Sequence, residues 1–222
     1  MQRTHFSKPA RPHFVERGDP LRERMERHIH TSFARVYGAD VNHFLPTLIG
    51  LEGTEGEILG ALGLAPGTNL HPFFLEQYLD AAVEQLLENY LDHPVARQDI
   101  VEVGNLAAGS PGAARLMIIC LTAYLRGAGF GWVVFTAVPA LRNAFLRLGI
   151  HLEELAPADG KRLGPDLKRW GSYYEQQPMV VATEVGQAFD QLRRYLEMEH
   201  ALAIHELWHQ AFAHGMKAGG MK

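Results

Sequence analysis

The sequence predicts an α/β protein with one mixed β-sheet, helices on both faces of that sheet, and a long C-terminal helix. Short apolar runs bounded by turn residues alternate with longer segments in which apolar residues recur every three or four positions. The pattern of residues 99–136 predicts a strand, a loop, a helix and a second strand, which is the order of a parallel crossover. A hairpin expected within residues 44–64 adds an antiparallel pair, so we expect the sheet to be mixed.

The composition is that of an ordinary globular protein. Its 222 residues are 47% apolar and 21% charged, which is enough for one good core, or for a domain with an appendage. We expect one domain over residues 1–183 and a helical appendage over residues 184–222. The single cysteine, Cys120, lies in an apolar run, and this favours a buried structural thiol over a nucleophile.

The first half of the chain predicts a strand, a helix, a β-hairpin and a second helix. We expect them at residues 13–17, 21–37, 44–51 with 58–64, and 73–91. In the first helix Met25, Ile29, Phe33 and Val36 are spaced to form one buried stripe. The polar turn EGTEGE separates the two strands of the hairpin.

The second half predicts three strands, each followed by a helix. The strands are expected at residues 99–107, 131–136 and 179–183, and the helices at 113–125, 139–148 and 187–214. Pro139 suits the first turn of its helix, and Gly149 is a typical helix terminator.

A loop of small residues joins the strand at 99–107 to the next helix. Small side chains allow close approach of a ligand, and the free N–H groups of a helix start attract an anion. We therefore predict phosphate binding by Gly109, Ser110, Gly112, Ala113 and Ala114. No Lys-Ser or Lys-Thr pair follows the glycines, which excludes a nucleotide-hydrolysing P-loop. The alternative is a turn without a ligand.

Glu102 and Asn105 lie within the same strand. Strand alternation places them on opposite sheet faces, unless a local bulge brings both toward one cleft. Valines flank Glu102, and burial of its carboxyl group would raise its pKa toward that of a general base. A solvated or paired structural carboxylate is the alternative.

Two further segments carry candidate binding residues. Glu76 lies among aromatic and leucine residues, where it either borders a site or belongs to the solvent face of a helix. Trp170, Tyr173 and Tyr174 lie in a glycine-containing loop that either lines an apolar pocket or packs on the core.

The C-terminal helix contains an HExxH pattern, His205 to His209, which is typical of zinc hydrolases. The two histidines lie about 40° apart around a helix, whereas His214 lies about 180° from His205 and cannot complete a ligand set. We therefore favour a solvent-facing pair of histidines and predict no metal requirement.

The N-terminal segment is basic although the whole chain has a net charge of −4: residues 1–35 hold eight Lys or Arg against four acidic side chains. Such a segment suits a phosphate or an acidic carrier protein, or it is a solvated helix face. Aromatic residues are not interleaved with its arginines, so we expect no nucleic-acid partner. We see neither a signal-peptide pattern nor an apolar run of ~18 residues, so we expect a cytoplasmic protein.

Four segments together resemble the thermostable hemolysin family. They are FFLEQYLD (residues 73–80), RQDIVEVGNLA (97–107), GWVVFTAVPALRNAFLRLGI (131–150) and WGSYYEQQPMVVA (170–182). The family resembles a branch of the GNAT (acetyltransferase-like) fold, similar in layout to acyl-homoserine-lactone synthases, which implies a splayed sheet. Those synthases carry an E-x-S-R pattern on the strand before the phosphate loop. Here Glu102 matches, while Gly104 and Asn105 replace Ser and Arg.

The resemblance implies an N-acyltransferase of autoinducer-synthase type. Its donor would be a phosphopantetheine thioester, on coenzyme A or an acyl-carrier protein, and its acceptor an amine. The resemblance also implies that the donor loop includes Leu106 and Ala107. Glu102 and Asn105 are then the expected catalytic residues, with Glu102 as base.

Under the same hypothesis, we expect Glu76 to bind the amine. We expect Trp170, Tyr173 and Tyr174 to border the acyl or acceptor pocket. Three alternatives stay open: a membrane-active protein that uses the apolar region 116–141, a zinc hydrolase, and a GNAT-shaped module that binds a donor without turnover.

Overall fold

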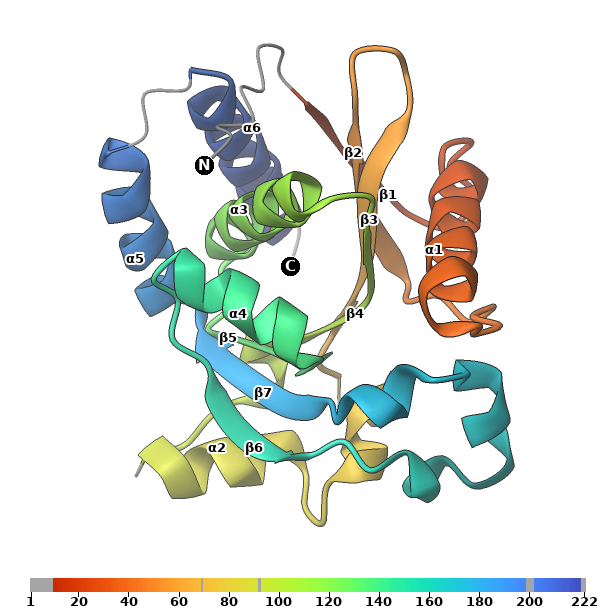
Figure 1. Ribbon diagram of the computed structural model, residues 1–222. Coiled ribbons are helices and arrows are strands. Elements are labelled where there is room, and N and C mark those ends of the chain that lie inside the picture. Colours follow the sequence, from red (N-terminus) through yellow and green to blue (C-terminus); the bar gives the residue numbers. More distant parts are fainter. Residues whose placement is uncertain (1–9, 69, 92, 199–201, 221–222) are drawn as a thin grey trace.

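The computed structural model describes residues 10–68, 70–91, 93–198 and 202–220. Within these ranges seven strands form one sheet in the order β1-β2-β3-β4-β5-β7-β6 (Figure 1). The strands are β1 (Arg11–Val15), β2 (Thr47–Glu52), β3 (Ile58–Pro66), β4 (Ile100–Ala108), β5 (Trp132–Ala137), β6 (Glu153–Pro157) and β7 (Met179–Glu184). Only β4 and β5 pair in parallel among these neighbours. The mixed sheet is confirmed.

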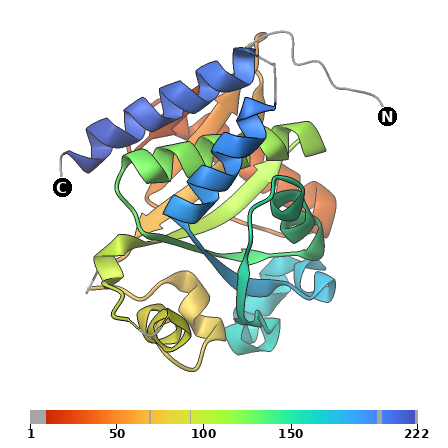
Figure 2. The same ribbon diagram turned by 90° about the vertical axis from the view of Figure 1, so that its left-hand side faces the viewer.

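Helices cover both faces of the sheet, as the sequence predicts (Figures 1 and 2). The α-helices are α1 (Arg22–Tyr37), α2 (Val83–Leu91), α3 (Pro111–Gly127), α4 (Pro139–Arg147), α5 (Val185–Glu197) and α6 (Leu202–Gly219). The 3-10 segments are η1 (Phe74–Tyr78), η2 (Arg97–Asp99), η3 (Gly160–Trp170) and η4 (Tyr173–Gln176). No helix in the described ranges combines the length and the apolar character needed to cross a membrane.

The central helix α3 is buried along most of its length. Every residue from Leu116 to Leu125 is at most 8% exposed, because the sheet covers one side of α3 and the helices α5 and α6 cover the other (Figure 2). A helix that is apolar all round is stable only when it is enclosed in this way. Cys120 is buried here, as expected, and burial raises the pKa of its thiol to about 12.

Two predicted helices are each divided in the structure. Residues 73–91 form η1 and α2, because the Glu76 carboxylate accepts N–H groups from both Phe73 and Val83 and so begins a new helix at Val83. The single helix predicted over residues 187–214 is also wrong. α5 ends at Glu197 and α6 begins at Leu202, and residues 199–201 lie outside the described residues. Both helices pack in one core with α3. A straight continuation of α5 would extend away from this core.

Strand β6 was not predicted from the sequence. Its residues, EELAP, show no apolar alternation, because β6 is an edge strand with a half-exposed burial pattern. The other strands and the first helix were predicted within a few residues of their observed bounds.

Glycines allow α3 and α6 to approach closely. A Cβ atom on Gly215 would lie 2.1 Å from the Tyr124 carbonyl oxygen, and one on Gly127 would lie 2.3 Å from the Phe212 carbonyl oxygen. Backbone cannot move aside as a flexible side chain does. The α3–α6 contact therefore requires glycine at both positions.

We expect Gly215→Ala to lower the free energy of unfolding by about 1–3 kcal/mol, because the added methyl group must push two helix backbones apart. Chemical denaturation followed by circular dichroism measures this change. The control is Gly186→Ala in α5, where the new Cβ would meet only the flexible Glu184 carboxylate at 3.3 Å. That control should keep or raise stability. Equal stability of Gly215→Ala and the unmodified protein would contradict the packing described.

Candidate active site

The sheet splays between its two parallel strands. β4 pairs with β5 only from Ile100↔Trp132 to Val103↔Phe135, whereas β4 continues along β3 as far as Ala108. Beyond Val103 the edge of β4 that faced β5 lies next to open space. The backbone of this edge therefore lies outside the β4–β5 pairing.

A β-bulge at Asn105 accompanies the splay. Gly63 lies opposite Gly104 and Ala61 lies opposite Ala107, so β4 has one residue more than β3 in this interval. Asn105 takes a φ of +57°, a conformation that asparagine tolerates better than most residues. The bulge turns the Asn105 amide toward the segment between α1 and β2, where its Nδ2 donates to the His43 carbonyl oxygen at 3.3 Å. The sequence analysis allowed for a local bulge between Glu102 and Asn105, and the structure contains one.

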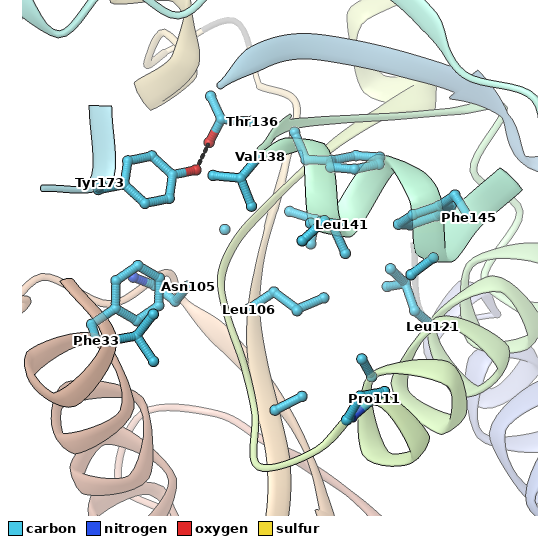
Figure 3. Close-up of a pocket in the computed structure, with 18 of the residues that line it drawn as sticks. Phe33, Asn105, Leu106, Pro111, Leu121, Thr136, Val138, Leu141, Phe145 and Tyr173 are labelled. Atoms are coloured by element: carbon cyan, nitrogen blue, oxygen red, sulfur yellow. Dashed lines mark hydrogen bonds between the residues drawn. The ribbon is translucent and has the colours of Figure 1, made fainter. Parts of the chain in front are cut away.

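A cleft of 1090 Å³ lies where β4 and β5 diverge. Figure 3 shows its lining residues on both sides of β4. On one side lies an aliphatic lobe formed by β4, α3 and α4: Leu106, Leu121, Leu141, Ala144, Phe145 and Leu148. On the other side lies an aromatic lobe formed by α1, η1, η3 and η4: Phe33, Tyr37, Phe74, Tyr78, Trp170 and Tyr173. Apolar walls with a few polar groups are typical of small-molecule sites.

Glu102 borders the cleft and is only 4% exposed. Its two carboxylate oxygens accept the N–H groups of Phe74 (2.8 Å) and Leu75 (3.0 Å) at the start of η1. Burial raises the pKa of the Glu102 carboxyl to about 7, against the opposing effect of the two N–H groups. Glu102 is thus both a structural anchor for η1 and a carboxyl group that titrates near neutrality.

Glu76 belongs to an ion-pair network behind η1 and does not line the cleft. The Arg97 guanidinium donates to both oxygens of Glu76, at 2.8 and 2.9 Å, and to Glu84 at 2.6 Å. Burial opposes ionisation of Glu76, but Arg97 and the N–H groups of Val83 and Phe73 outweigh it and lower the pKa of Glu76. Its oxygens are thus already engaged by partners within the protein.

The predicted phosphate loop lies at one end of the cleft. The Ser110 hydroxyl accepts the Ala113 N–H at 3.2 Å, and the Ser110 carbonyl accepts the Ala114 N–H at 3.0 Å. Pro111 has no N–H, so Gly112 is the position in the first turn of α3 whose N–H can face a ligand. Gly109, Ser110, Gly112 and Ala114 line the cleft.

Positive charge predominates around the cleft. Among the described residues that line it, Arg35, Arg115 and Arg147 carry positive charge and Glu102 alone is acidic. The three arginines come from three different helices, α1, α3 and α4. An anionic ligand is therefore favoured over a cationic one at the mouth of the cleft.

The structure brings together nine of the thirteen residues expected at the site. Those that line the cleft are Glu102, Asn105, Leu106, Gly109, Ser110, Gly112, Ala114, Trp170 and Tyr173. Ala107 and Ala113 are buried beside it, and Glu76 lies in the network with Arg97. The Tyr174 hydroxyl hydrogen-bonds to the Tyr78 hydroxyl from outside the lining.

Apart from Leu106, the aliphatic lobe was missed from the sequence, and so was most of the aromatic lobe. Leu121, Leu141 and Phe145 have the spacing of ordinary core positions on α3 and α4, and a periodic pattern does not distinguish a core from a cavity wall. Phe74 and Tyr78 belong to the aromatic residues around Glu76, for which the sequence indicates no separate role. The adjacent pair of phenylalanines, Phe73 and Phe74, was a usable signal, because a helix can bury only one of two neighbouring residues well.

The HExxH segment lies on α6, away from the cleft. His205 is half-buried, His209 is exposed, and the His214 ring stacks on Phe14 with centroids 4.1 Å apart. The described part of the chain contains no group of three or more His, Cys, Asp or Glu side chains that could hold a metal ion. These residues offer no metal centre to a zinc hydrolase.

A family model for thermostable hemolysin matches residues 15–189, which is more than half of the chain. The chain belongs to the thermostable hemolysin family. The match includes every lining residue of the cleft except Tyr195 and ends within α5, so the HExxH segment of this hemolysin-family protein lies beyond it. No curated protein matches the chain.

Solved structures similar to this hemolysin-family protein include three synthases. FeeM, an N-acyl amino acid synthase from uncultured soil microbes, has a TM-score of 0.56 at 14% identity, over 85% of this chain and 98% of FeeM. The acyl-homoserine lactone (AHL) synthase LasI has a TM-score of 0.55 at 13% identity, over 82% and 95% of the two chains. BjaI, a CoA-dependent acyl-homoserine lactone synthase solved with SAM and isopentyl-CoA, has a TM-score of 0.53 at 14% identity, over 89% and 98%. The GNAT-like fold is therefore shown.

We expect Arg97→Ala to lower the free energy of unfolding by about 3 kcal/mol at pH 7, because two largely buried carboxylates lose their shared cation. The effect should shrink in acid. The pKa of Glu76 is lowered on folding, so this stabilisation is present at neutral pH and is lost as the pH falls through that depressed pKa.

Denaturant titrations at a series of pH values measure the Arg97→Ala effect. The matched control is Arg27→Ala, whose ion pair with Glu23 is exposed on α1 and should contribute less than about 0.5 kcal/mol. A pH-independent loss in Arg97→Ala would count against the network as its cause.

Proposed function

We propose that this protein is an N-acyltransferase that moves an acyl group from a phosphopantetheine thioester, on coenzyme A or an acyl-carrier protein, to an amine. One observation carries the proposal: the buried Glu102 carboxyl, with a pKa of about 7, borders the cleft near the place where β4 leaves β5. The similarity in fold to acyl-homoserine lactone and N-acyl amino acid synthases supports it.

The donor is expected to enter at the positive mouth of the cleft. Its phosphates would meet the Gly112 N–H at the start of α3 and the guanidinium groups of Arg115 and Arg147. The pantetheine would then run along the splayed edge of β4 beyond Val103. Backbone N–H groups of that edge would stabilise the oxyanion that develops on the thioester carbonyl.

The acyl chain fits the aliphatic lobe. Burying an apolar chain against leucine and phenylalanine side chains contributes about 0.8 kcal/mol for each CH₂ group removed from water. The Phe135 and Phe145 rings stack with centroids 5.0 Å apart and close one side of the lobe. The lobe therefore favours acyl chains longer than acetyl.

Glu102 is the expected base. The amine arrives as an ammonium ion and loses one proton to the Glu102 carboxylate. Its nitrogen then attacks the thioester carbon, the C–N bond forms, and the C–S bond breaks. The second nitrogen proton goes to the departing sulfur, which leaves as the thiol. Asn105, on the same side of β4, is available to hold the amine or the carbonyl through its amide.

Glu102→Gln should reduce turnover by about 10²–10⁴-fold, because the variant lacks the base. Its amide oxygen can still accept one of the two η1 N–H groups, and its circular dichroism should match that of the unmodified protein. Release of free thiol from a panel of acyl-CoA and acyl-carrier donors with amines measures turnover. The control is Glu197→Gln, an exposed carboxylate at the end of α5, which should keep full activity. Because the carboxylate is the active form, kcat/KM of the unmodified protein should rise with pH around 7.

Absence of thiol release over a broad panel, together with absence of donor binding by calorimetry, would overturn the proposal. Leakage of dye from liposomes without any donor would favour a membrane-active protein instead. Donor binding without turnover would leave a binding module.

Ala144→Phe should shift donor preference to shorter acyl chains by at least ~10-fold in kcat/KM, because the larger side chain fills the aliphatic lobe. Competition between octanoyl and butanoyl donors measures the shift. Leu146→Ala, on an exposed side of the same helix and 58% exposed, is the control and should keep the original preference. An unchanged preference in Ala144→Phe would place the acyl chain elsewhere.

A further inference from the structure

The aromatic lobe presents a preformed wall of flat rings. The Trp170 ring centroid lies 6.0 Å from that of Phe74 and 5.5 Å from that of Tyr173. Phe33 and Tyr173 are each 7% exposed and support the wall from behind, with Phe33 6.3 Å from Trp170. Rings supported in this way offer apolar faces that need no rearrangement to receive a ligand.

Phe74 joins this wall to the carboxylate. Its side chain is 36% exposed, although the flanking Phe73 and Leu75 are buried. Its backbone N–H donates to the Glu102 carboxylate at 2.8 Å. The residue that carries the exposed ring therefore also binds the proposed base through its backbone N–H. A ligand that covers the Phe74 ring has room for only a short linker between its own flat part and the base.

Inside the cleft, below the positive mouth, the Glu102 carboxylate and the aromatic faces favour an amine. Glu102 is the single carboxylate among the described residues that line the cleft, and aromatic faces attract cations. A protonated amine is drawn to both, and Glu102 is the carboxylate there that can take its proton. The aliphatic lobe offers no comparable pair of groups.

We propose that the acceptor is a primary amine joined through a short linker to an aromatic ring, with the ring on the Phe74–Trp170 wall and the nitrogen at Glu102. This inference rests on the proposed acyltransferase function and names its acceptor class. Two sources share this chemistry, namely arylalkylamines and aromatic amino acids. Arg35, on the α1 side of the opening, would pair with the carboxylate of an amino acid.

The experiment compares 2-phenylethylamine, phenylalanine and hexylamine as acceptors with one acyl-CoA donor. Hexylamine is apolar but lacks a ring. Binding of each amine is measured separately through tryptophan fluorescence, because Trp132 and Trp208 are buried whereas Trp170 lines the cleft. We expect the better of the two aromatic amines to bind and react at least 10-fold better than hexylamine. Which one it is identifies the source.

Phe74→Leu and Trp170→Leu should each weaken binding of the aromatic amine by about 10-fold and leave that of hexylamine nearly unchanged. Binding to Trp170→Leu is measured by calorimetry, because this variant lacks the tryptophan that reports on the cleft. Phe74 is partly exposed, so Phe74→Leu keeps the test valid should Trp170→Leu fail to fold. The control is Tyr90→Leu, which removes an aromatic ring that is 58% exposed on α2 and outside the cleft.

Equal or better use of hexylamine would overturn this inference while the acyltransferase function stands. The same holds if both variants bind the aromatic amine normally. Failure of every donor to release thiol with any amine would instead overturn the proposed function.

Discussion

The hydrogen bonds between the Glu102 carboxylate and the first N–H groups of η1 connect the parts on which the site depends. They join β4 to a segment almost thirty residues earlier in the chain. η1 is in turn held from behind by the Glu76–Arg97 ion pair. One carboxyl group thus fixes the position of Phe74 and Tyr78, while its own burial sets its affinity for a proton. The base and the wall beside it cannot move independently.

The bulge at Asn105 is the second constraint. It accompanies the departure of β4 from β5, and it places Glu102 and Asn105 on one side of the sheet and Leu106 on the other. A regular strand would close the sheet and remove the cleft. The conformational cost of a positive φ at Asn105 is small beside the sheet pairing that surrounds it on β3.

The sequence predicted the architecture well, because periodicity and turn residues are local. It predicted that Glu102 and the loop at Gly109–Gly112 belong to one site, since both lie on one strand–helix unit. It failed where distant contacts decide the outcome. The break after η1 depends on a hydrogen bond from Glu76 to Val83, and the turn after α5 depends on a shared core with α3. Leu141 and Phe145 were not recognised as site residues, because apolar residues have the same helical spacing in a cavity wall and in a core.

The two lobes of the cleft are built from different segments of the chain. Residues of α3 and α4 form one lobe, whereas residues of α1, η1 and the η3–η4 loop form the other. Changes in one set need not disturb the other. Relatives with this scaffold can therefore change the ligand preference of one lobe without changing that of the other. A chimera that exchanges residues 139–148 between two such proteins should transfer the ligand preference of the aliphatic lobe alone.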